Sequence, residues 1–362
     1  MPNTVVASRA DRLGNRLLTM MSARDFAIKI DANLVINWPS SSFSYDSSND
    51  YYDFFELFDP VQFEVHEKRV SITSESHDAL IRRSLVDCAF DLFKHPPKKI
   101  DYFAFENRNF LFRSPKDYEF VEGEDQSINK TSYGVTFFQS LQFNQTVDAC
   151  LRDILASLPT CSSLSLHIRR GDLIPMIQEF GKGIDESDVR KAITRVASLF
   201  STKYAPLEAY EETVKTYGSD RPVLLFSDDP TMFGQLSKRC RNTIIDVSSL
   251  VQGYGLSAVQ AAFVEILVMS KTMSIVSTGS SFSHIACYIG NIRRRRVSKY
   301  IRPDHLLRDL NALCESNAYK DLVMYEVMRV TTNRMPEGSG RRAAFIAALE
   351  TLKRERFAGC SP

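Results

Sequence analysis

The stretch that decides the fold is LSLHIRRGD, residues 164–172, in which an apolar run ends in charged and small residues. Its first five residues have the length and composition of a buried strand. In an open parallel sheet, ligands bind beyond the carboxyl ends of the strands, where His167, Arg169 and Arg170 project. Two arginines there offer planar donor forks that match phosphate oxygens. The alternative is a pair of surface arginines with Asp172 as their ion-pair partner.

Further strands and helices alternate along the second half of the chain. The predicted strands are 223–226, 243–247 and 274–276, and the predicted helices are 187–203, 231–240, 257–270 and, in the tail, 341–356. This alternation indicates an α/β fold, with a parallel sheet that carries helices on both faces. Near the start, a loop with Gly14 and Asn15 precedes a predicted helix over 17–30 and a strand over 34–38, whereas 61–145 shows no clear elements.

Length and composition indicate a globular protein of more than one domain. The chain has 362 residues, of which 44% are hydrophobic and 25% are charged, with a formal net charge of +1. This balance argues against a nucleic-acid binder that works through an overall basic field. No apolar run reaches the ~18 residues that span a bilayer, so no integral membrane association is expected. We place an N-terminal domain at 1–158, a second at 159–315 and a helical tail at 316–362.

The cysteines and the N-terminus favour a cytoplasmic protein. Seven cysteines form no CxxC pair and mostly lie among apolar residues, as reduced and buried thiols do. The opening MPNTVVASRADR lacks the pattern of a secretory signal. A disulfide set and a removed anchor are the alternatives.

Two carboxylates follow the predicted strand at 223–226. Asp228 and Asp229 have the chemistry to bind a metal or a ribose. Asp229 before Pro230 is also an ordinary helix start, with Asp229 as N-cap and Pro230 at the first helical position. We favour this structural role for Asp229. Metal binding by the pair is less favoured still, because no further carboxylate lies at a helpful spacing.

A strand, a turn of small residues and a short helix are predicted within MSIVSTGSSFSHIACYIG, residues 273–290. Free backbone N–H groups and the helix dipole would form an anion site, with hydroxyl donors from Ser280 and Ser281. The alternative is plain capping of the helix by one of these serines. Upstream, Glu265 is the one charge in an apolar helix, so it either faces solvent or accepts hydrogen bonds from a ligand such as a ribose.

In their order and spacing, four segments resemble the fucosyltransferase superfamily, which includes nodulation and core-type, blood-group-type and protein O-fucosyltransferases. The segments are RLGNRLL (12–18) with LVINW (34–38), HIRRGD (167–172), FSDDP (226–230) and STGSSFSHIACYIG (277–290). The resemblance implies a GT-B architecture of two facing Rossmann-like domains. It also implies an inverting, metal-independent and cofactor-free transfer of fucose, or a related deoxyhexose, from a GDP-sugar to a glycan or other hydroxyl acceptor.

The resemblance also implies roles for individual residues. Arg169 and Arg170 hold the donor pyrophosphate, and His167 is the leading histidine of the motif. The other donor contacts expected are Asp228, Glu265, Ser280, Ser281 and Phe282. Gly14, Asn15 and Arg16 match the loop that faces the donor sugar and the acceptor. Glu179 lies in the loop where some core-type members carry an acidic base, and it is our candidate for that role.

Sugar transfer from a GDP-sugar requires fixed positive groups in the site, because breaking the sugar–phosphate bond leaves a highly charged diphosphate. Two other classes stay open: a catalytically silent nucleotide- or glycan-binding module, and a metal-dependent phosphohydrolase that uses Asp228 and Asp229. Two further segments are assigned structural roles. In the aromatic loop 43–59, FFELF (54–58) is expected to pack the domain rather than stack on a glycan. The four arginines at 293–296 are expected to form a solvated turn.

Overall fold

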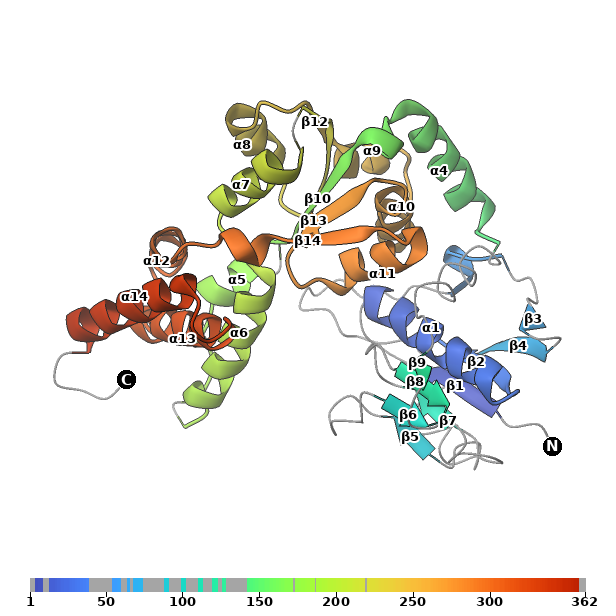
Figure 1. The fold of residues 1–362 in the computed structure, drawn as a ribbon, viewed down its shortest axis with the longest axis horizontal. Coiled ribbons are helices and arrows are strands. Elements are labelled where there is room, and N and C mark those ends of the chain that lie inside the picture. The colour runs from blue at the N-terminus through green and yellow to red at the C-terminus, as the bar shows by residue number, and fades with distance from the viewer. Residues whose placement is uncertain are drawn as a thin grey trace. The chain divides into compact units, whose positions relative to one another are not determined.

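The structure is a computed structural model, drawn in Figure 1. It describes residues 4–8, 13–38, 54–59, 142–171, 173–185, 187–218 and 220–357, with short strands between residues 64 and 127. The chain divides into two compact units. Unit 1 comprises Met1–Thr160, Ser249–Thr272 and Ser281–Arg293, and unit 2 comprises Cys161–Ser248, Met273–Ser280 and Arg294–Pro362. The domain limits 158, 159 and 315 stay a prediction.

Unit 1 is built on a six-stranded sheet in the order β3-β4-β2-β1-β7-β5. The strands are β1 (Thr4–Ser8), β2 (Asn33–Asn37), β3 (Glu64–Val65), β4 (Lys68–Thr73), β5 (Cys88–Phe90) and β7 (Phe110–Phe112). All neighbours pair in parallel except β3, which runs antiparallel to β4. A second, three-stranded sheet holds β6 (Lys99–Asp101), β8 (Glu119–Glu122) and β9 (Gln126–Ser127).

The chain opens with a strand rather than with the predicted loop. The apolar residues of β1 are buried, and β1 lies between β2 and β7 in the middle of the sheet. Helix α1 (Leu13–Lys29) begins four residues before its predicted start, so Gly14 lies inside its first turn. A Cβ atom at Gly14 would lie 2.9 Å from the backbone of Ser281 and Phe282. A glycine is therefore needed here because α1 meets α11 (Ser281–Gly290) at close range.

Aromatic side chains pack between the helices of unit 1. Helix α10 (Ala258–Met269) contacts α4 (Gln145–Ser157) and α11. The short 3-10 helix η1 (Phe54–Glu56) contributes buried Phe54, whose ring lies 4.7 Å from that of Phe58. Phe58 in turn lies 5.2 Å from Phe263 of α10. The predicted packing role of FFELF is confirmed for Phe54, Leu57 and Phe58, whereas Phe55 is exposed. Residues 43–53 lie outside the described part of the chain.

Unit 2 contains the parallel α/β sheet predicted from the alternating pattern, in the order β12-β11-β10-β13-β14. Its strands are β10 (Leu164–Ile168), β11 (Val223–Ser227), β12 (Ile244–Asp246), β13 (Ser274–Ser277) and β14 (Arg293–Arg296). Leu164 of β10 pairs with Val223 on one side and with Ser274 on the other, both in parallel. The first four strands lie within one residue of their predicted bounds.

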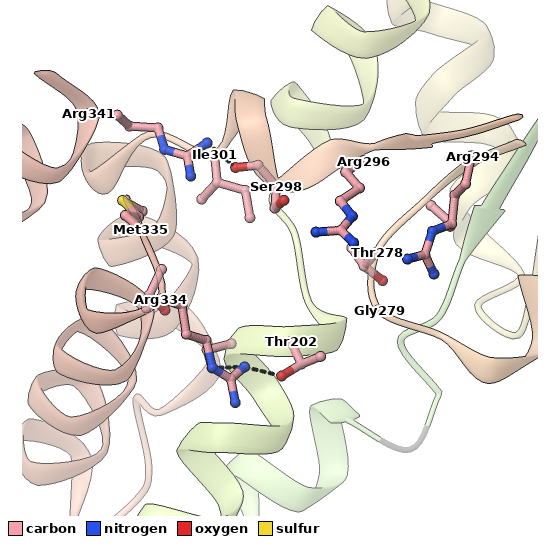
Figure 2. A pocket seen from close by; sticks show the side chains of 13 residues that line it. Thr202, Thr278, Gly279, Arg294, Arg296, Ser298, Ile301, Arg334, Met335 and Arg341 are labelled. Atoms are coloured by element: carbon pink, nitrogen blue, oxygen red, sulfur yellow. Dashed lines mark hydrogen bonds between the residues drawn. The ribbon is translucent and has the colours of Figure 1, made fainter. Parts of the chain in front are cut away.

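The four arginines at 293–296 form strand β14 at the edge of this sheet, so the prediction of a solvated turn is wrong. Arg294 and Arg295 are half-buried, and Arg293 and Arg296 are exposed. Charged residues suit an edge strand, because they discourage pairing with another chain. Figure 2 shows that Arg294 and Arg296 project from the same side of the strand.

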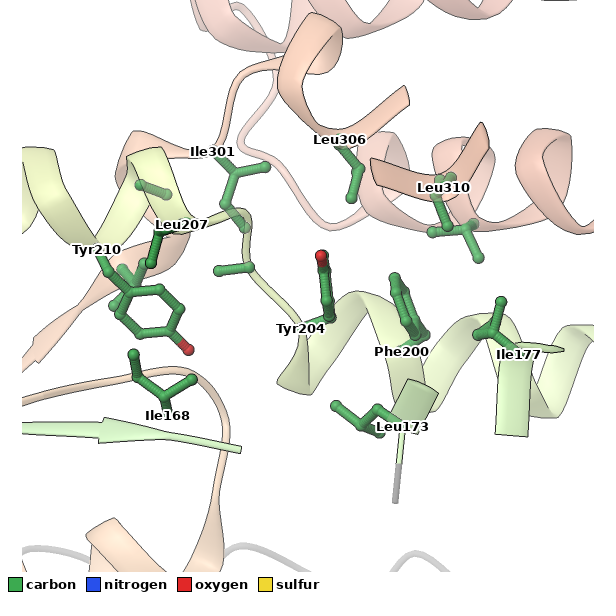
Figure 3. Packing of buried hydrophobic residues seen from close by; sticks show 14 of the residues in the cluster. Ile168, Leu173, Ile177, Phe200, Tyr204, Leu207, Tyr210, Ile301, Leu306 and Leu310 are labelled. Carbon is green, nitrogen blue, oxygen red and sulfur yellow. The ribbon is translucent and has the colours of Figure 1, made fainter. Parts of the chain in front are cut away.

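The helices of unit 2 surround one hydrophobic core, part of which is shown in Figure 3. They are α5 (Leu173–Gln178), α6 (Val189–Lys203), α7 (Leu207–Gly218), α8 (Thr231–Arg239), α12 (Pro303–Leu313), α13 (Lys320–Asn333) and α14 (Gly340–Arg356), with the 3-10 helix η5 (Val297–Tyr300). The short helix α9 (Val247–Gln252) follows β12. The predicted tail helix, α14, packs against α12 and α13. None of the helices in the described residues has the length and apolar character to cross a bilayer.

The described cysteines include four free thiols, Cys150, Cys161, Cys240 and Cys314. Burial raises the pKa of Cys314 to about 11, so this side chain stays a neutral thiol at neutral pH. The predicted burial is confirmed for Cys150 and Cys314, whereas Cys240 is half-buried and Cys161 is exposed.

Candidate functional site

Three of the motifs end at the same edge of the sheet in unit 2. β10 lies between β11 and β13, and all three strands run in the same direction. His167 pairs with Phe226 of β11 and with Ser277 of β13. Residues 169–171, 228–229 and 278–280 therefore leave the sheet side by side at its carboxyl edge, which is where parallel sheets bind ligands.

Arg170 points into unit 2 rather than into solvent. Its side chain is only 8% exposed, and its Nη2 donates a hydrogen bond of 3.1 Å to the carbonyl oxygen of Ala205. Its guanidinium lies 5.0 Å from the ring centroid of Tyr204, which is a cation–π contact. The backbone N–H of Arg170 donates to Oδ1 of Asp228 at 2.6 Å. Arg170 is thus fixed at both its backbone and its side chain.

Tyr204 is itself held firmly. Its ring stacks on Phe200 with a centroid distance of 4.3 Å, as Figure 3 shows, and its hydroxyl donates to Oδ2 of Asp309 at 2.8 Å. Burial raises the pKa of Tyr204 far above its ordinary value, although the Arg170 charge opposes this. The tyrosine is therefore a neutral and rigid platform for the Arg170 guanidinium.

The small-residue turn after β13 is attached to the end of α6. The N–H of Gly279 donates to the carbonyl of Thr202 at 2.9 Å, and the hydroxyl of Thr278 donates to the carbonyl of Lys203 at 2.6 Å. The N–H of Ser280 donates to the carbonyl of Thr278. The expectation of free N–H groups is wrong for Gly279 and Ser280, because both N–H groups donate to carbonyl oxygens of the chain itself. A Cβ at Gly279 would lie 2.5 Å from a methyl carbon of Thr202, which explains the glycine.

Tyr210 of α7 connects the three strand ends. Burial raises its pKa to about 12, and the nearby Arg170 charge opposes this increase. The carboxylate of Asp228 acts on the same hydroxyl and raises the pKa further. One buried phenol thus lies within interaction range of Arg170, Thr278 and Asp228.

His167 lies in β10, two residues before the arginines, and is 7% exposed. Burial lowers the pKa of its imidazole from 6.5 to about 4, because a charged ring loses its hydration there. At neutral pH His167 is therefore uncharged.

The two aspartates after β11 have different tasks. Asp228 is exposed and accepts the Arg170 N–H, and its carboxyl carbon would lie 3.1 Å from a Cβ at Gly171. Asp229 caps α8, since its Oδ1 accepts the N–H of Thr231 at 2.9 Å. The structural role predicted for Asp229 is confirmed, although Pro230 occupies the N-cap and the helix begins one residue later. Among the described residues, no group of three His, Cys, Asp or Glu side chains could hold a metal ion.

Arg169 and Glu179 are more accessible. Arg169 is half-exposed, while Asp172 lies outside the described residues. Glu179 follows α5 and is 65% exposed, and its carboxylate pairs with Lys182 at 3.6 Å. No contact within the described residues brings Glu179 to Arg170, and its role as a base stays a prediction.

The remaining predicted residues belong to unit 1. Arg16 is 5% exposed, and its guanidinium lies 5.0 Å from the ring centroid of Trp38. Asn15 is half-buried, and its carbonyl accepts the hydroxyl of Thr19 at 2.9 Å. Ser281 and Phe282 are half-exposed and meet Gly14, as described above. Glu265 is half-buried on α10. The first and last motifs therefore meet in unit 1, and a ligand shared with Arg169 stays a prediction.

Sequence reasoning missed the residues that organise the site. Tyr204, Ala205 and Tyr210 come from the linker between α6 and α7 and from the first turn of α7. Their sequence, YAPLEAY, carries two aromatic residues around a proline. That aromatic and apolar character was the available signal, but it is equally typical of ordinary core packing.

No protein-family model and no curated protein matches this chain. Among solved structures, it is similar to NodZ alpha-1,6-fucosyltransferase soaked with GDP-fucose, at 14% identity and a TM-score of 0.48, covering 80% of this chain and 93% of that one. It is also similar to the fucosyltransferase NodZ from Bradyrhizobium, at 14% identity and a TM-score of 0.45, covering 79% and 93%. A third is POFUT1 in complex with GDP-fucose, at 12% identity and a TM-score of 0.43, covering 82% and 96%. At these identities the likeness concerns the fold alone.

Proposed function

We propose that this chain is an inverting, metal-independent glycosyltransferase, which binds a GDP-sugar and moves its fucose, or a related deoxyhexose, to a hydroxyl acceptor. The proposal is supported chiefly by the meeting of three motif ends at the carboxyl edge of one parallel sheet. The segment from Thr202 to Tyr210 ties these ends together through Arg170 and Thr278. Such an edge is the usual ligand site of a parallel sheet.

In this proposal Arg169 and Arg170 have different roles. Arg169 is half-exposed beyond the end of β10, and in this proposal its guanidinium contacts the diphosphate of the donor. Arg170 is buried and positions the loop, because it is fixed by Ala205, Tyr204 and Asp228.

The reaction needs positive charge where the bond breaks. The acceptor oxygen forms a bond to the anomeric carbon, the bond to the diphosphate oxygen breaks, and GDP leaves with the electron pair. Fixed guanidinium groups that face this oxygen stabilise the charge that develops, without the help of a metal ion. The proton of the acceptor hydroxyl needs a base, and exposed Glu179 remains the candidate for this role.

Replacement of Arg169 tests the proposal directly. Arg169→Ala should lower the turnover of GDP-fucose by about 10²-fold, because one preorganised donor to the leaving group is lost. Arg152→Ala is the control, since Arg152 lies on α4 with its side chain 71% exposed and paired with Asp148. Transfer or hydrolysis of GDP-fucose would be measured with EDTA present. Full turnover in Arg169→Ala would remove this edge from the mechanism.

Nucleotide binding separates an enzyme from a silent module. GDP should raise the melting temperature as a ligand of the native state, whereas UDP should not. Equal shifts from GDP and UDP would contradict the proposed base selectivity. A GDP shift without any turnover of GDP-fucose would favour the silent binding module.

A further inference from the structure

Unit 2 contains a cavity of about 360 Å³ that is lined by four arginines, here named the arginine pocket. Arg294 and Arg296 come from β14, Arg334 directly follows α13, and Arg341 lies in the first turn of α14 (Figure 2). Arg334 and Arg341 lie close to each other in the sequence, whereas β14 precedes them by two α-helices, so the fold brings the two groups of charges together.

Strand geometry explains how β14 supplies two of these arginines. Side chains alternate along a strand, so Arg294 and Arg296 share a face. Arg295 lies on the other face, where its guanidinium is 4.6 Å from the ring centroid of Tyr217. Arg293 also alternates away from the pocket and does not line it.

Neutral groups hold the other two arginines in place. Arg334 donates through Nη2 to the hydroxyl of Ser198 at 2.8 Å, and through Nη1 to the hydroxyl of Thr202. Arg341 donates to the carbonyl oxygen of Ser298. Hydroxyl and carbonyl oxygens orient the guanidinium groups, but they do not neutralise them.

The walls of the arginine pocket carry no acidic side chain, because none of the described residues that line it is Asp or Glu. Burial lowers the pKa values of Arg334 and Arg341, and no carboxylate offsets this effect. By contrast, hydrogen bonds from Arg308 to Glu208 and Asp309 raise the pKa of Arg308. Like charges that line one cavity repel each other, and a bound anion would relieve this repulsion.

We propose that the arginine pocket binds a compact polyanion that carries at least two phosphate or sulfate groups. Guanidinium forks match the oxygens of such groups, and hydroxyls of Thr202 and Thr278 line the same cavity. Its volume falls within the range of roughly 300–1,000 Å³ that is typical of small-molecule sites. No aromatic ring lines it among the described residues, so a nucleobase finds no stacking surface.

The arginine pocket is distinct from the proposed donor site. Arg169, Arg170 and Ser280 do not line it. Both sites border the turn after β13, since Thr278 and Gly279 line the arginine pocket and Thr278 also interacts with Tyr210. The inference therefore goes beyond the proposed transfer reaction and does not depend on it.

Calorimetric titration of the full chain with inorganic pyrophosphate tests the inference. Excess GDP is present to occupy the donor site, and 150 mM NaCl screens diffuse attraction. We expect one bound pyrophosphate, at least tenfold weaker binding in Arg296→Gln and in Arg334→Gln, and a change below twofold in Arg293→Gln. Arg293 and Arg296 are both exposed arginines of β14. They lie on opposite faces of the strand, and only Arg296 lines the arginine pocket, so Arg293→Gln is the matched control. A trisulfated disaccharide in parallel titrations identifies which oxyanion is preferred.

Three results would overturn the inference. One is the absence of binding for both pyrophosphate and the sulfated disaccharide. Another is an equal loss of affinity in Arg293→Gln and Arg296→Gln, which would indicate diffuse attraction. The third is a loss that follows Arg169→Ala instead, which would place the anion at the donor site. Turnover of GDP-fucose is measured separately, so failure of the proposed function leaves this result unaffected.

Discussion

Arginine pairs occur at two places in the sheet of unit 2, and their surroundings differ. Arg170, after β10, is covered by Tyr204 and donates to a backbone carbonyl in the protein interior. Arg294 and Arg296, within β14, face a cavity whose described lining contains no carboxylate. The neighbours of a guanidinium, rather than its place in a motif, determine whether it supports the fold or attracts a ligand.

Arg170→Ala should produce the largest effect on stability. It should lower the free energy of unfolding by about 3 kcal/mol, through the unpaired Ala205 carbonyl, the lost ring contact and the space left behind. Arg169→Ala, at the half-exposed neighbour, should cost less than about 1 kcal/mol. Urea denaturation of both variants measures the difference. Equal midpoints would show that Arg170 is not a buried support.

His167 adds a second buried basic side chain to the comparison. Burial leaves His167 uncharged at neutral pH, whereas the buried Arg170 guanidinium stays charged. Its folded pKa of about 4 lies below the unfolded value of 6.5, so the unfolded state binds more protons between these values. Its contribution to stability is present above pH 6.5 and is lost as the pH falls towards 4. From pH 7 to pH 5, the wild type should lose about 2 kcal/mol more than His167→Gln does. Parallel urea titrations at both pH values would contradict this if the two proteins lost the same amount.

Gly279→Ala tests the turn after β13, which borders both the proposed donor site and the arginine pocket. The new Cβ would lie 2.5 Å from a methyl carbon and 2.9 Å from the carbonyl oxygen of Thr202, so the turn must shift. We expect a loss of about 2 kcal/mol in the free energy of unfolding, as for other overpacked positions. Gly234→Ala in α8 is the control, because no atom lies within 4 Å of its added Cβ. Thermal unfolding in which Gly279→Ala matches that control would rule out the close contact.

Arg296→Gln should have the smallest effect on stability, and in the opposite direction. Removal of one of four like charges should raise the free energy of unfolding by about 0.5 kcal/mol at low salt. The gain should disappear at high salt, where charge interactions are screened. Denaturation with urea at two salt concentrations measures both. Destabilisation at low salt would mean that a neighbouring group already balances the charge.

The sequence predicted the regular half of the chain well, for a simple physical reason. β10 to β13 are apolar runs that end in polar or small residues, and such runs form buried strands wherever helices alternate with them. The opening β1 was missed because a five-residue run without a neighbouring pattern is ambiguous. The edge strand β14 was missed because four arginines carry no apolar periodicity, and its pairing with the sheet is a tertiary contact.

Local sequence thus determined the parallel sheet and the motif ends that gather at its carboxyl edge, because strand direction and chain order place them there. Only the tertiary structure decided that Arg170 turns inward onto Tyr204, and that Gly279 hydrogen-bonds to the end of α6. It alone brought Arg294, Arg334 and Arg341 to one cavity. The direction of a charged side chain depends on which distant carbonyls, rings and charges surround it, and a local pattern holds no record of those neighbours.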